Sequence, residues 1–306
     1  KYDPDIIHLH NLHGYYINIK ILFHYLKESK AHIIWTLHDC WAFTGHCAYF
    51  DYVGCKKWIT GCYKCALKRE YPSSLCLDQS KKHYRLKREL IYNLENLTII
   101  TPSNWLKELA EQSYLGKFPV RVIHNGIDTN VFKYKESNLR DRLNLHGKKV
   151  ILGVASTWNE RKGLGAFVEL SKKLNEEYKI VLVGLSKKQI SKMPSNILGI
   201  SQTNSTIELA EYYSLADVFV NPTLEDNYPT TNLEAIACGT PVITYNTGGS
   251  SESASTYGIV VEKGNVDELE KAILNIQKIK LKTPFSLDYC DMVKKYLKLY
   301  KLKLDK

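Results

Sequence analysis

Short apolar runs rich in β-branched residues alternate along the chain with longer segments of helical periodicity. The short runs predict strands at residues 5–10, 33–37, 97–101, 120–123, 150–154, 180–183, 218–221 and 242–244. The longer segments predict helices at residues 16–27, 79–95, 103–112, 164–174, 207–215, 231–237 and 289–304. This alternation is typical of parallel sheets joined by right-handed crossover helices, so it predicts the doubly wound α/β class.

Two stretches interrupt the alternation and indicate how the chain is divided. Residues 39–78 are rich in Cys, Gly and aromatic side chains, and a loop of this length is usually functional or held by its own internal structure. Residues 124–147 are polar and begin with an Asn-Gly turn signal, after which the strand pattern restarts. We therefore predict a first domain at 1–128, which contains the insertion 39–78, and a second domain at 129–285.

The charge of the chain is unevenly distributed. The 306 residues carry a net charge of +10, with +6 over residues 1–124, −2 over 125–277 and +6 over 278–306. Basic segments of this kind suit nucleic acid, an anionic membrane surface or a phosphorylated substrate, and ordinary solvated helix faces would give the same pattern. No run approaches the roughly 18 apolar residues that a membrane-spanning helix needs.

The sequence begins with Lys1, and it enters a strand-like run within a few residues. It shows neither an initiator Met nor the basic and then apolar pattern of a secretory signal. We therefore expect that the chain starts in the middle of a domain and that the protein is cytoplasmic.

The first candidate for chemistry follows the predicted strand 218–221. A Pro-containing loop carries Glu225 and Asp226, and a helix opens near Thr230 with Glu234 on its first turns. The start of a helix leaves backbone N–H groups unpaired and carries partial positive charge, so anionic phosphates bind there. Acids on either side of a bound diphosphate could hold sugar hydroxyls. Ordinary capping of the helix by acids would produce the same local pattern.

The segment after this helix makes the pattern specific. The helix ends at Gly239, a buried strand follows, and Gly248-Gly249 form a turn at its carboxyl end. The run from Asn221 to Glu252 resembles the signature of retaining glycosyltransferases of family 4, which have the GT-B fold. That signature has two acids eight positions apart, then Ala-x-Ala-x-Gly-x-Pro-Val and a Gly-Gly turn. The spacing falls here on Asp226 and Glu234, although the first acid of the family is usually Glu.

The resemblance implies roles for these residues. Glu234 would hydrogen-bond the ribose of a sugar-nucleotide donor, and Asp226 would contact the transferred sugar. A second match, residues 153–163, ends in Arg161-Lys162-Gly163, where basic side chains can clamp a diphosphate. The family usually has an Arg where Thr157 stands, and we expect Arg161 to supply that charge. The full donor-binding set is Arg161, Lys162, Glu225, Asn227, Thr230, Thr231 and Glu234.

The first domain resembles the same family along its whole length. Residues 5–11 and 35–39 are strands that end in polar side chains, and by resemblance His38 faces the donor sugar and joins Asp226 as a catalytic residue. A His at a strand end is often only a structural residue. The resemblance also implies that the last segment, 286–306, crosses back onto the first domain. An opening strand and a Gly-rich loop of the family would precede Lys1, so the first domain is expected to be incomplete.

The insertion contains a candidate metal site. Its cysteines at Cys47, Cys55, Cys62 and Cys65 could hold a structural zinc ion in tetrahedral geometry, with His46 as a substitute ligand. Reduced buried thiols explain the same residues equally well, and disulfides are less expected in a cytosolic chain.

These observations predict retaining transfer of a sugar from a nucleoside-diphosphate donor to a saccharide acceptor that is lipid-linked, in bacterial surface-polysaccharide synthesis. No cofactor is expected for catalysis, and no nucleic acid is expected as a partner. A basic helix would place the protein at the inner face of the cytoplasmic membrane through Lys81, Lys82, Arg85, Lys87 and Arg88, next to Leu86, Leu90 and Leu94. Two other interpretations are open, namely a zinc-containing nucleic-acid binder and a non-catalytic remnant.

Overall fold

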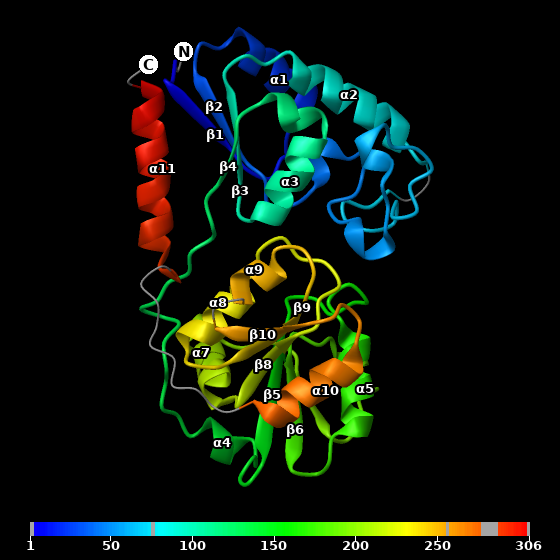
Figure 1. Cartoon of the computed structure of the whole chain (residues 1–306), viewed down its shortest axis with the longest axis vertical. Coiled ribbons are helices and arrows are strands. Elements are labelled where there is room, and N and C mark those ends of the chain that lie inside the picture. The colour runs from blue at the N-terminus through cyan, green and yellow to red at the C-terminus, as the bar shows by residue number, and fades with distance from the viewer. Residues whose placement is uncertain (1–2, 75–76, 255–256, 277–286, 305–306) are drawn as a thin grey trace. The chain divides into compact units, whose positions relative to one another are not determined.

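The computed structural model describes residues 3–74, 77–254, 257–276 and 287–304. The chain divides into two compact units (Figure 1). The amino-terminal unit consists of Lys1–His124 together with Val293–Lys306, and the carboxy-terminal unit is Asn125–Met292. Each unit has its own parallel sheet, and all eight predicted strands are present in the two sheets. Among the described residues, no helix has the length and apolar character that crossing a membrane requires.

The amino-terminal unit is built on a four-stranded sheet in which every neighbouring pair is parallel. Its strands follow the order β1-β2-β3-β4 and are β1 (Ile6–Leu9), β2 (His32–Thr36), β3 (Leu97–Thr101) and β4 (Val120–Val122). Its helices are α1 (Ile19–Glu28), α2 (Ser80–Tyr92), α3 (Asn104–Gln112) and α11 (Tyr289–Leu304), of which α11 joins this unit from Val293 onward.

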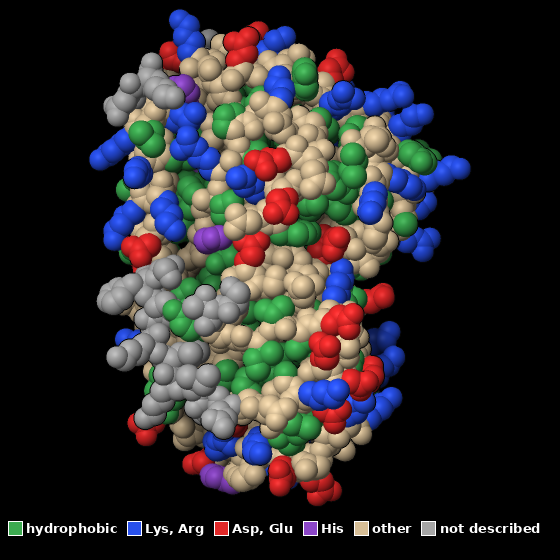
Figure 2. Space-filling model, viewed as in Figure 1, with side chains coloured by type: hydrophobic (Ala, Val, Ile, Leu, Met, Phe, Trp, Pro, Cys, Tyr) green, Lys and Arg blue, Asp and Glu red, His purple; other side chains and the backbone are tan. Residues whose placement is uncertain are grey.

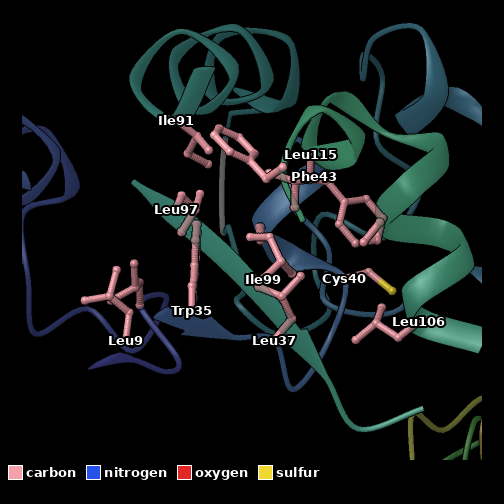
Figure 3. Close-up of a cluster of buried hydrophobic side chains, with 14 of the residues drawn as sticks. Leu9, Trp35, Leu37, Cys40, Phe43, Ile91, Leu97, Ile99, Leu106 and Leu115 are labelled. Carbon is pink, nitrogen blue, oxygen red and sulfur yellow. The ribbon is translucent and has the colours of Figure 1, made fainter. Parts of the chain in front are cut away.

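Alternation along the strands gives this sheet two different faces. Leu9, Trp35 and Ile99 point into the hydrophobic core that also includes side chains of α2 and the insertion (Figure 3). His8 and Thr36 lie on the other face, where they contact α11. A helix contributed by the end of the chain therefore covers a polar part of the sheet.

Three local expectations for this unit are corrected. Helix α1 begins at Ile19 and not at residue 16, because the side chain of Asn18 accepts from the backbone N–H groups of Lys20 and Ile21 and so caps the helix there. Helix α2 does not present Lys87 with its other basic residues, since Lys87 is only 3% exposed. Leu94, expected at a lipid boundary, is buried in the core as well.

The insertion 39–78 is irregular, as its composition predicts. Its described part contains three short 3-10 turns at Trp41–Phe43, Asp51–Val53 and Lys57–Ile59. Phe43, Phe50 and Trp58 pack against one another with ring centroids 5.2–6.3 Å apart. Gly45 is required here, because a Cβ atom would lie 2.3 Å from the carbonyl oxygen of Ser80. An aromatic cluster and a close backbone approach therefore hold this loop together.

The carboxy-terminal unit contains a six-stranded parallel sheet in the order β10-β9-β8-β5-β6-β7. The strands are β5 (Lys149–Val154), β6 (Tyr178–Val183), β7 (Ile197–Ile200), β8 (Val218–Asn221), β9 (Val242–Tyr245) and β10 (Gly258–Val261). The outermost strands, β7 and β10, were not predicted from the sequence. The helices are α4 (Leu139–Arg142), α5 (Leu164–Lys173), α6 (Lys187–Ile190), α7 (Thr206–Leu215), α8 (Thr230–Ala237), α9 (Ser250–Ala254) and α10 (Val266–Asn275).

Helices cover both faces of this sheet (Figure 1). In β5, Val150 and Leu152 belong to the core that includes α7 and α8, whereas Ile151 belongs to the core that includes α5 and α10. The chain runs from β5 outward to β7, and then returns to β8 and continues to β10 on the other side. Strands β5 and β8 therefore flank the point where the strand order reverses, and ligands of open α/β sheets bind at the carboxyl ends of such strands.

Candidate functional site

The loops that follow β5 and β8 meet at the point where the strand order reverses, within the carboxy-terminal unit. The Lys162 ammonium lies 2.5 Å from the Asp226 carboxylate, and their side chains are 24% and 11% exposed. The Arg161 guanidinium donates to the carbonyl oxygen of Glu225 at 2.6 Å. The structure therefore pairs Lys162, predicted for donor binding, with Asp226, predicted as catalytic, and it places Arg161 against the backbone of Glu225.

At two glycines of the site, one after β5 and one after β9, the backbone approaches the loop that follows β8 too closely for a side chain. Gly163 has φ +76°, and a Cβ atom there would lie 2.0 Å from the carbonyl oxygen of Pro222. Gly248 has φ +52°, and its Cβ atom would lie 2.1 Å from the carbonyl oxygen of Asp226, which also accepts from the backbone N–H of Gly249 at 3.0 Å. The Gly-Gly turn of the signature, which follows β9, thus packs directly against the backbone of Asp226.

Helix α8 begins at Thr230, as predicted, and no side chain hydrogen-bonds to its first turn from the N-cap residue Pro229. Its first turn contains no acid either. The backbone N–H groups of Thr230 and Thr231 therefore lie at a helix start with partial positive charge, close in sequence to Asp226 and Asn227. This arrangement suits an anionic ligand.

Glu234 lies one turn further along α8, and it is mostly buried. Tyr213 of α7, whose side chain is fully buried, donates its hydroxyl hydrogen to Glu234 Oε2 at 2.8 Å. Burial raises the pKa of the Glu234 carboxyl, while the hydrogen bonds from Tyr213 and Thr230 act in the opposite direction. The carboxylate is thus held in one orientation by a neighbouring helix, which the sequence pattern did not indicate.

A buried polar network ties the elements of this site together. Asn232 of α8 accepts from Asn221 at the end of β8 at 2.8 Å, and it donates to Ser253 of α9 at 2.8 Å. Ser250 completes the link through a hydrogen bond of 2.7 Å with Thr244 of β9. Buried polar groups that are fully hydrogen-bonded specify one arrangement. Asn232 is within the signature, but sequence reasoning did not single it out, because its partners lie far away along the chain.

In the amino-terminal unit, the predicted catalytic residue His38 belongs to a group of histidines at the ends of β1 and β2. His38 Nε2 lies 2.9 Å from His10 Nδ1, and His10 in turn lies 4.3 Å from His8 between ring centroids. Burial lowers the pKa of His8 to about 4, helped by the nearby His10 and His38. Burial lowers the pKa of His38 as well. The role of His38 stays a prediction, and the structure adds His10 as its hydrogen-bond partner.

Four of the six cysteines of the insertion, Cys47, Cys55, Cys62 and Cys65, belong to or pack against a single hydrophobic cluster. The Cys47 thiol donates to the sulfur of Cys65, which raises the pKa of Cys47 and lowers that of Cys65. In the described part of the chain, however, no group of three or more His, Cys, Asp or Glu side chains is arranged to hold a metal ion. The tetrahedral set expected from the sequence is therefore not preformed, and zinc binding stays a prediction.

Comparison with known proteins agrees with this fold and with the sequence signature. The family model for Glycosyltransferase Family 4 matches residues 1–131, and the model for Glycosyl transferases group 1 matches residues 148–278. The structure of Anabaena Alr3699/HepE in complex with UDP-glucose superimposes with a TM-score of 0.67 at 15% identity, covering 97% of this chain and 78% of that one. The two units thus define a GT-B fold. The chain belongs to the glycosyltransferases of this fold, with a family 4 domain followed by a group 1 domain.

Curated relatives are bacterial. The chain is 29% identical over 259 residues to the putative colanic acid biosynthesis glycosyl transferase WcaC of Escherichia coli, covering 81% of this chain and 62% of the relative. It is 26% identical over 187 residues to the N,N'-diacetylbacillosaminyl-diphospho-undecaprenol alpha-1,3-N-acetylgalactosaminyltransferase of Campylobacter jejuni. That match covers 55% of this chain and 49% of the relative. The chain therefore spans about half to two thirds of the length of these relatives.

Proposed function

We propose that the chain is part of a retaining glycosyltransferase that moves a sugar from a nucleoside diphosphate to a lipid-linked saccharide in bacterial surface-polysaccharide synthesis. The observation that carries this proposal is the pairing of Lys162 with Asp226 at the uncapped start of α8. A cation and a carboxylate pair there, a few residues before the start of α8 and beyond the carboxyl ends of the central strands β5 and β8.

The diphosphate of the donor has two partners in this arrangement. Its oxygens accept from the backbone N–H groups at the start of α8, and they also attract the ammonium of Lys162. In the structure, Lys162 is paired with Asp226. When the diphosphate binds, Lys162 shifts to it, and the Asp226 carboxylate becomes available to the hydroxyl groups of the transferred sugar.

Glu234 recognises the nucleoside half of the donor. A carboxylate accepts hydrogen bonds from two vicinal ribose hydroxyls, and the hydrogen bond from Tyr213 fixes its orientation. A partly buried acceptor of this kind is worth about 1.5–3 kcal/mol to a ligand that satisfies it. The HepE structure holds UDP-glucose, which supports a UDP-sugar as the donor class.

Catalysis then depends on positioning and on charge, not on a protein nucleophile. Charge develops on the departing diphosphate in the transition state, and Lys162 together with the α8 amides stabilises it. The leaving phosphate accepts the proton of the acceptor hydroxyl as that hydroxyl attacks the same face of the sugar. Retention of configuration follows from this same-face attack.

The acceptor side is the amino-terminal unit. The name of the Campylobacter relative specifies a diphospho-undecaprenol substrate, which supports a lipid-linked acceptor. Figure 2 shows Lys and Arg side chains gathered over α2 and the insertion, and again over α11. The exposed basic residues of α2 are Lys81, Lys82, Arg85 and Arg88. We propose that they hold the protein at the anionic inner face of the cytoplasmic membrane.

A direct assay tests this proposal. The protein is incubated with UDP-glucose, UDP-galactose and their N-acetylated counterparts together with a prenyl-diphosphate-linked sugar, and the anomeric configuration of the product is read by NMR. An α-linked product from an α-linked donor supports retention. An inverted product, or the same products with the Lys162→Ala variant as with the unchanged protein, contradicts the proposed mechanism.

A further inference from the structure

The amino-terminal unit contains a cavity that neither the donor site nor the histidines of β1 and β2 explain. It has a volume of about 810 Å³ and lies between the start of α1, the start of α2 and the insertion. Trp41, His46, His83 and Lys87 line it, together with Tyr16 and Lys20. None of these residues belongs to the donor set.

The lining of this cavity is basic. It includes His13, His46, His83, Lys20 and Lys87, and it includes no Asp or Glu. The nearest acids already have backbone partners. Asp39 accepts from His13 and from the backbone N–H of Trp41, both at 2.8 Å. Asp78 accepts from the backbone N–H groups of Cys65 and Ser80. The cavity thus has basic side chains and no carboxylate in its own lining.

Two of these donors are costly to bury without a ligand. Lys87 is 3% exposed, and its ammonium lies 3.7 Å from the centre of the Trp41 ring and donates to the Trp41 carbonyl oxygen. His46 Nε2 is buried and has no close hydrogen-bond partner among the described residues, while the backbone carbonyl groups of Lys68 and Glu70 interact with the His46 ring. A buried polar atom without a partner is rare in folded proteins and needs an explanation. An anion in the cavity would pair with both groups.

Helix starts add to this preference for an anion. Asn18, Ile19 and Lys20, at the start of α1, line the cavity, and so does Gln79, the N-cap residue of α2. The first turn of α2 contains no acid, but Asp78, just before the helix, accepts from the backbone N–H of Ser80, and Asn18 caps α1. The positive ends of both helix dipoles thus lie at the cavity, with part of their backbone N–H groups already paired to Asn18 and Asp78.

Aromatic side chains supply the apolar part of the cavity. Tyr15 and Tyr16 line it and are 74% and 66% exposed, and Trp41 forms part of its wall. The electron-rich face of an aromatic ring attracts the C–H groups of a sugar, because those hydrogens carry partial positive charge. Exposed tyrosines next to a basic cavity thus suit a ligand that is both sugar and anion.

We propose that this cavity binds the phosphate-linked sugar of the acceptor, with the phosphate held by His46, His83 and Lys87 and the sugar placed against Trp41 and Tyr16. This assignment rests on the proposed function for the identity of the ligand as an acceptor. The binding of a sugar phosphate by the cavity is tested without any turnover.

Calorimetry with glucose 1-phosphate tests this site, in the presence of saturating UDP so that the donor site is occupied. The His83→Gln and Lys20→Gln variants change exposed residues and are expected to fold. His83→Gln should weaken binding about tenfold because a hydrogen bond to the phosphate is lost, and Lys20→Gln should weaken it about threefold because a positive charge is removed from the lining. Methyl α-glucoside, which lacks the phosphate, should bind at least tenfold more weakly than glucose 1-phosphate. The matched control is His24→Gln, an exposed change on α1 outside the cavity, which should alter binding less than twofold.

A second titration distinguishes the source of the ligand. If the acceptor is lipid-linked, glucose attached through a diphosphate to a ten-carbon prenyl alcohol should bind at least as tightly as glucose 1-phosphate and compete with it. Glucose 1-phosphate that binds no better than methyl α-glucoside overturns the proposal, and so does unchanged binding in both variants. Loss of UDP binding alone would contradict the proposed function and leave the cavity result intact.

Discussion

Lys162 Nζ lies 2.5 Å from Asp226 Oδ2, across the loops that follow β5 and β8. The sequence suggested both residues for different reasons, one as a phosphate clamp and the other as a sugar contact, and the structure pairs them. When the donor binds, Lys162 can leave Asp226 for the diphosphate, and Asp226 can then accept hydrogen bonds from the sugar. The two residues should therefore respond differently to substitution.

Asp226→Asn should preserve nucleotide binding and impair transfer. The change removes the negative charge that competes with the diphosphate for Lys162, so the affinity for UDP should stay the same or rise up to about tenfold. Turnover should fall at least about a hundredfold, because a charged partner of the transferred sugar is lost. Isothermal titration with UDP and an assay of product formation check both parts. Weaker UDP binding in the Asn variant would contradict this assignment.

Tyr213 is predicted to position Glu234 without touching the donor. Tyr213→Phe removes a hydrogen bond of 2.8 Å and should lower UDP affinity about three- to tenfold. The neighbouring Tyr212→Phe is the matched control, since Tyr212 is also buried on α7. Equal UDP affinity in the two variants would mean that Glu234 does not depend on Tyr213.

Glu234→Gln should stabilise the protein while it weakens the donor site. Burial raises the pKa of this carboxyl, so its ionised form costs free energy in the folded state at neutral pH. A neutral Gln of the same shape avoids that cost, and we expect the Gln variant to melt at a higher temperature at pH 7. The difference should shrink as the pH falls below the raised pKa, where Glu234 is protonated. UDP affinity should fall by about 1.5–3 kcal/mol. A lower melting temperature at pH 7 would count against this account.

His8 makes the docking of α11 sensitive to acid. His8 accepts or donates hydrogen bonds with Tyr300 at 2.6 Å and with Thr36 at 2.8 Å, and its pKa is lowered to about 4. Because the folded state disfavours the protonated ring, stability present above pH 6.5 should decline as the pH falls from 6.5 toward 4. We expect a loss of about 1–2 kcal/mol after a discount for solvent screening. The His8→Gln variant should show a smaller decline in urea unfolding over this range, and an identical decline would refute the role of His8.

The cysteines of the insertion give a prediction about zinc. Protein purified without chelators should contain about one equivalent, and a chelator should lower its melting temperature, if Cys47, Cys55, Cys62 and Cys65 close around the ion. Because the described residues contain no preformed ligand set, binding must rearrange the cysteines. If elemental analysis finds no zinc in freshly reduced protein, the prediction is wrong and the four cysteines are simply reduced thiols.

Membrane association is predicted to depend on α2. Protein should sediment with vesicles that contain phosphatidylglycerol, less so as salt rises, and the quadruple change of Lys81, Lys82, Arg85 and Arg88 to Gln should abolish it. The control changes four exposed Lys residues of the carboxy-terminal unit to Gln. Equal sedimentation with neutral phosphatidylcholine vesicles would argue against an electrostatic surface.

The sequence was sufficient for the elements with strong periodicity and for the signature, and insufficient for contacts between distant residues. Strands β7 and β10 are short, at four residues each, and lie at the edges of the sheet, so their patterns are weak. Helical spacing in fact places Lys87 on the same face as the buried residues Tyr84 and Ile91, so the prediction that grouped it with the other basic residues overlooked the helical period. The hydrogen bond between Tyr213 and Glu234 spans 21 positions, and no local rule indicates it.

The interpretation as a zinc-containing nucleic-acid binder, which was drawn from charge and cysteine content, is weakened by the site and by the family models. A nucleic-acid binder would need no acid-base pair at the carboxyl ends of β5 and β8, and the family models match 1–131 and 148–278 as glycosyltransferase domains. Whether the chain turns over substrate by itself is decided by the assay of product formation described above.

The central claim, a sugar-nucleotide site at Lys162, Asp226 and the start of α8, is tested most directly by calorimetry with UDP-glucose. The unchanged protein should bind with a dissociation constant that rises about tenfold or more in Lys162→Ala, because a charge-assisted contact to the diphosphate is lost. Lys173→Ala, which removes an ammonium of α5 that lies 2.6 Å from the Asp267 carboxylate of α10, should bind as the unchanged protein does. Equal affinities for all three proteins, or no binding of any UDP-sugar, would contradict the claim.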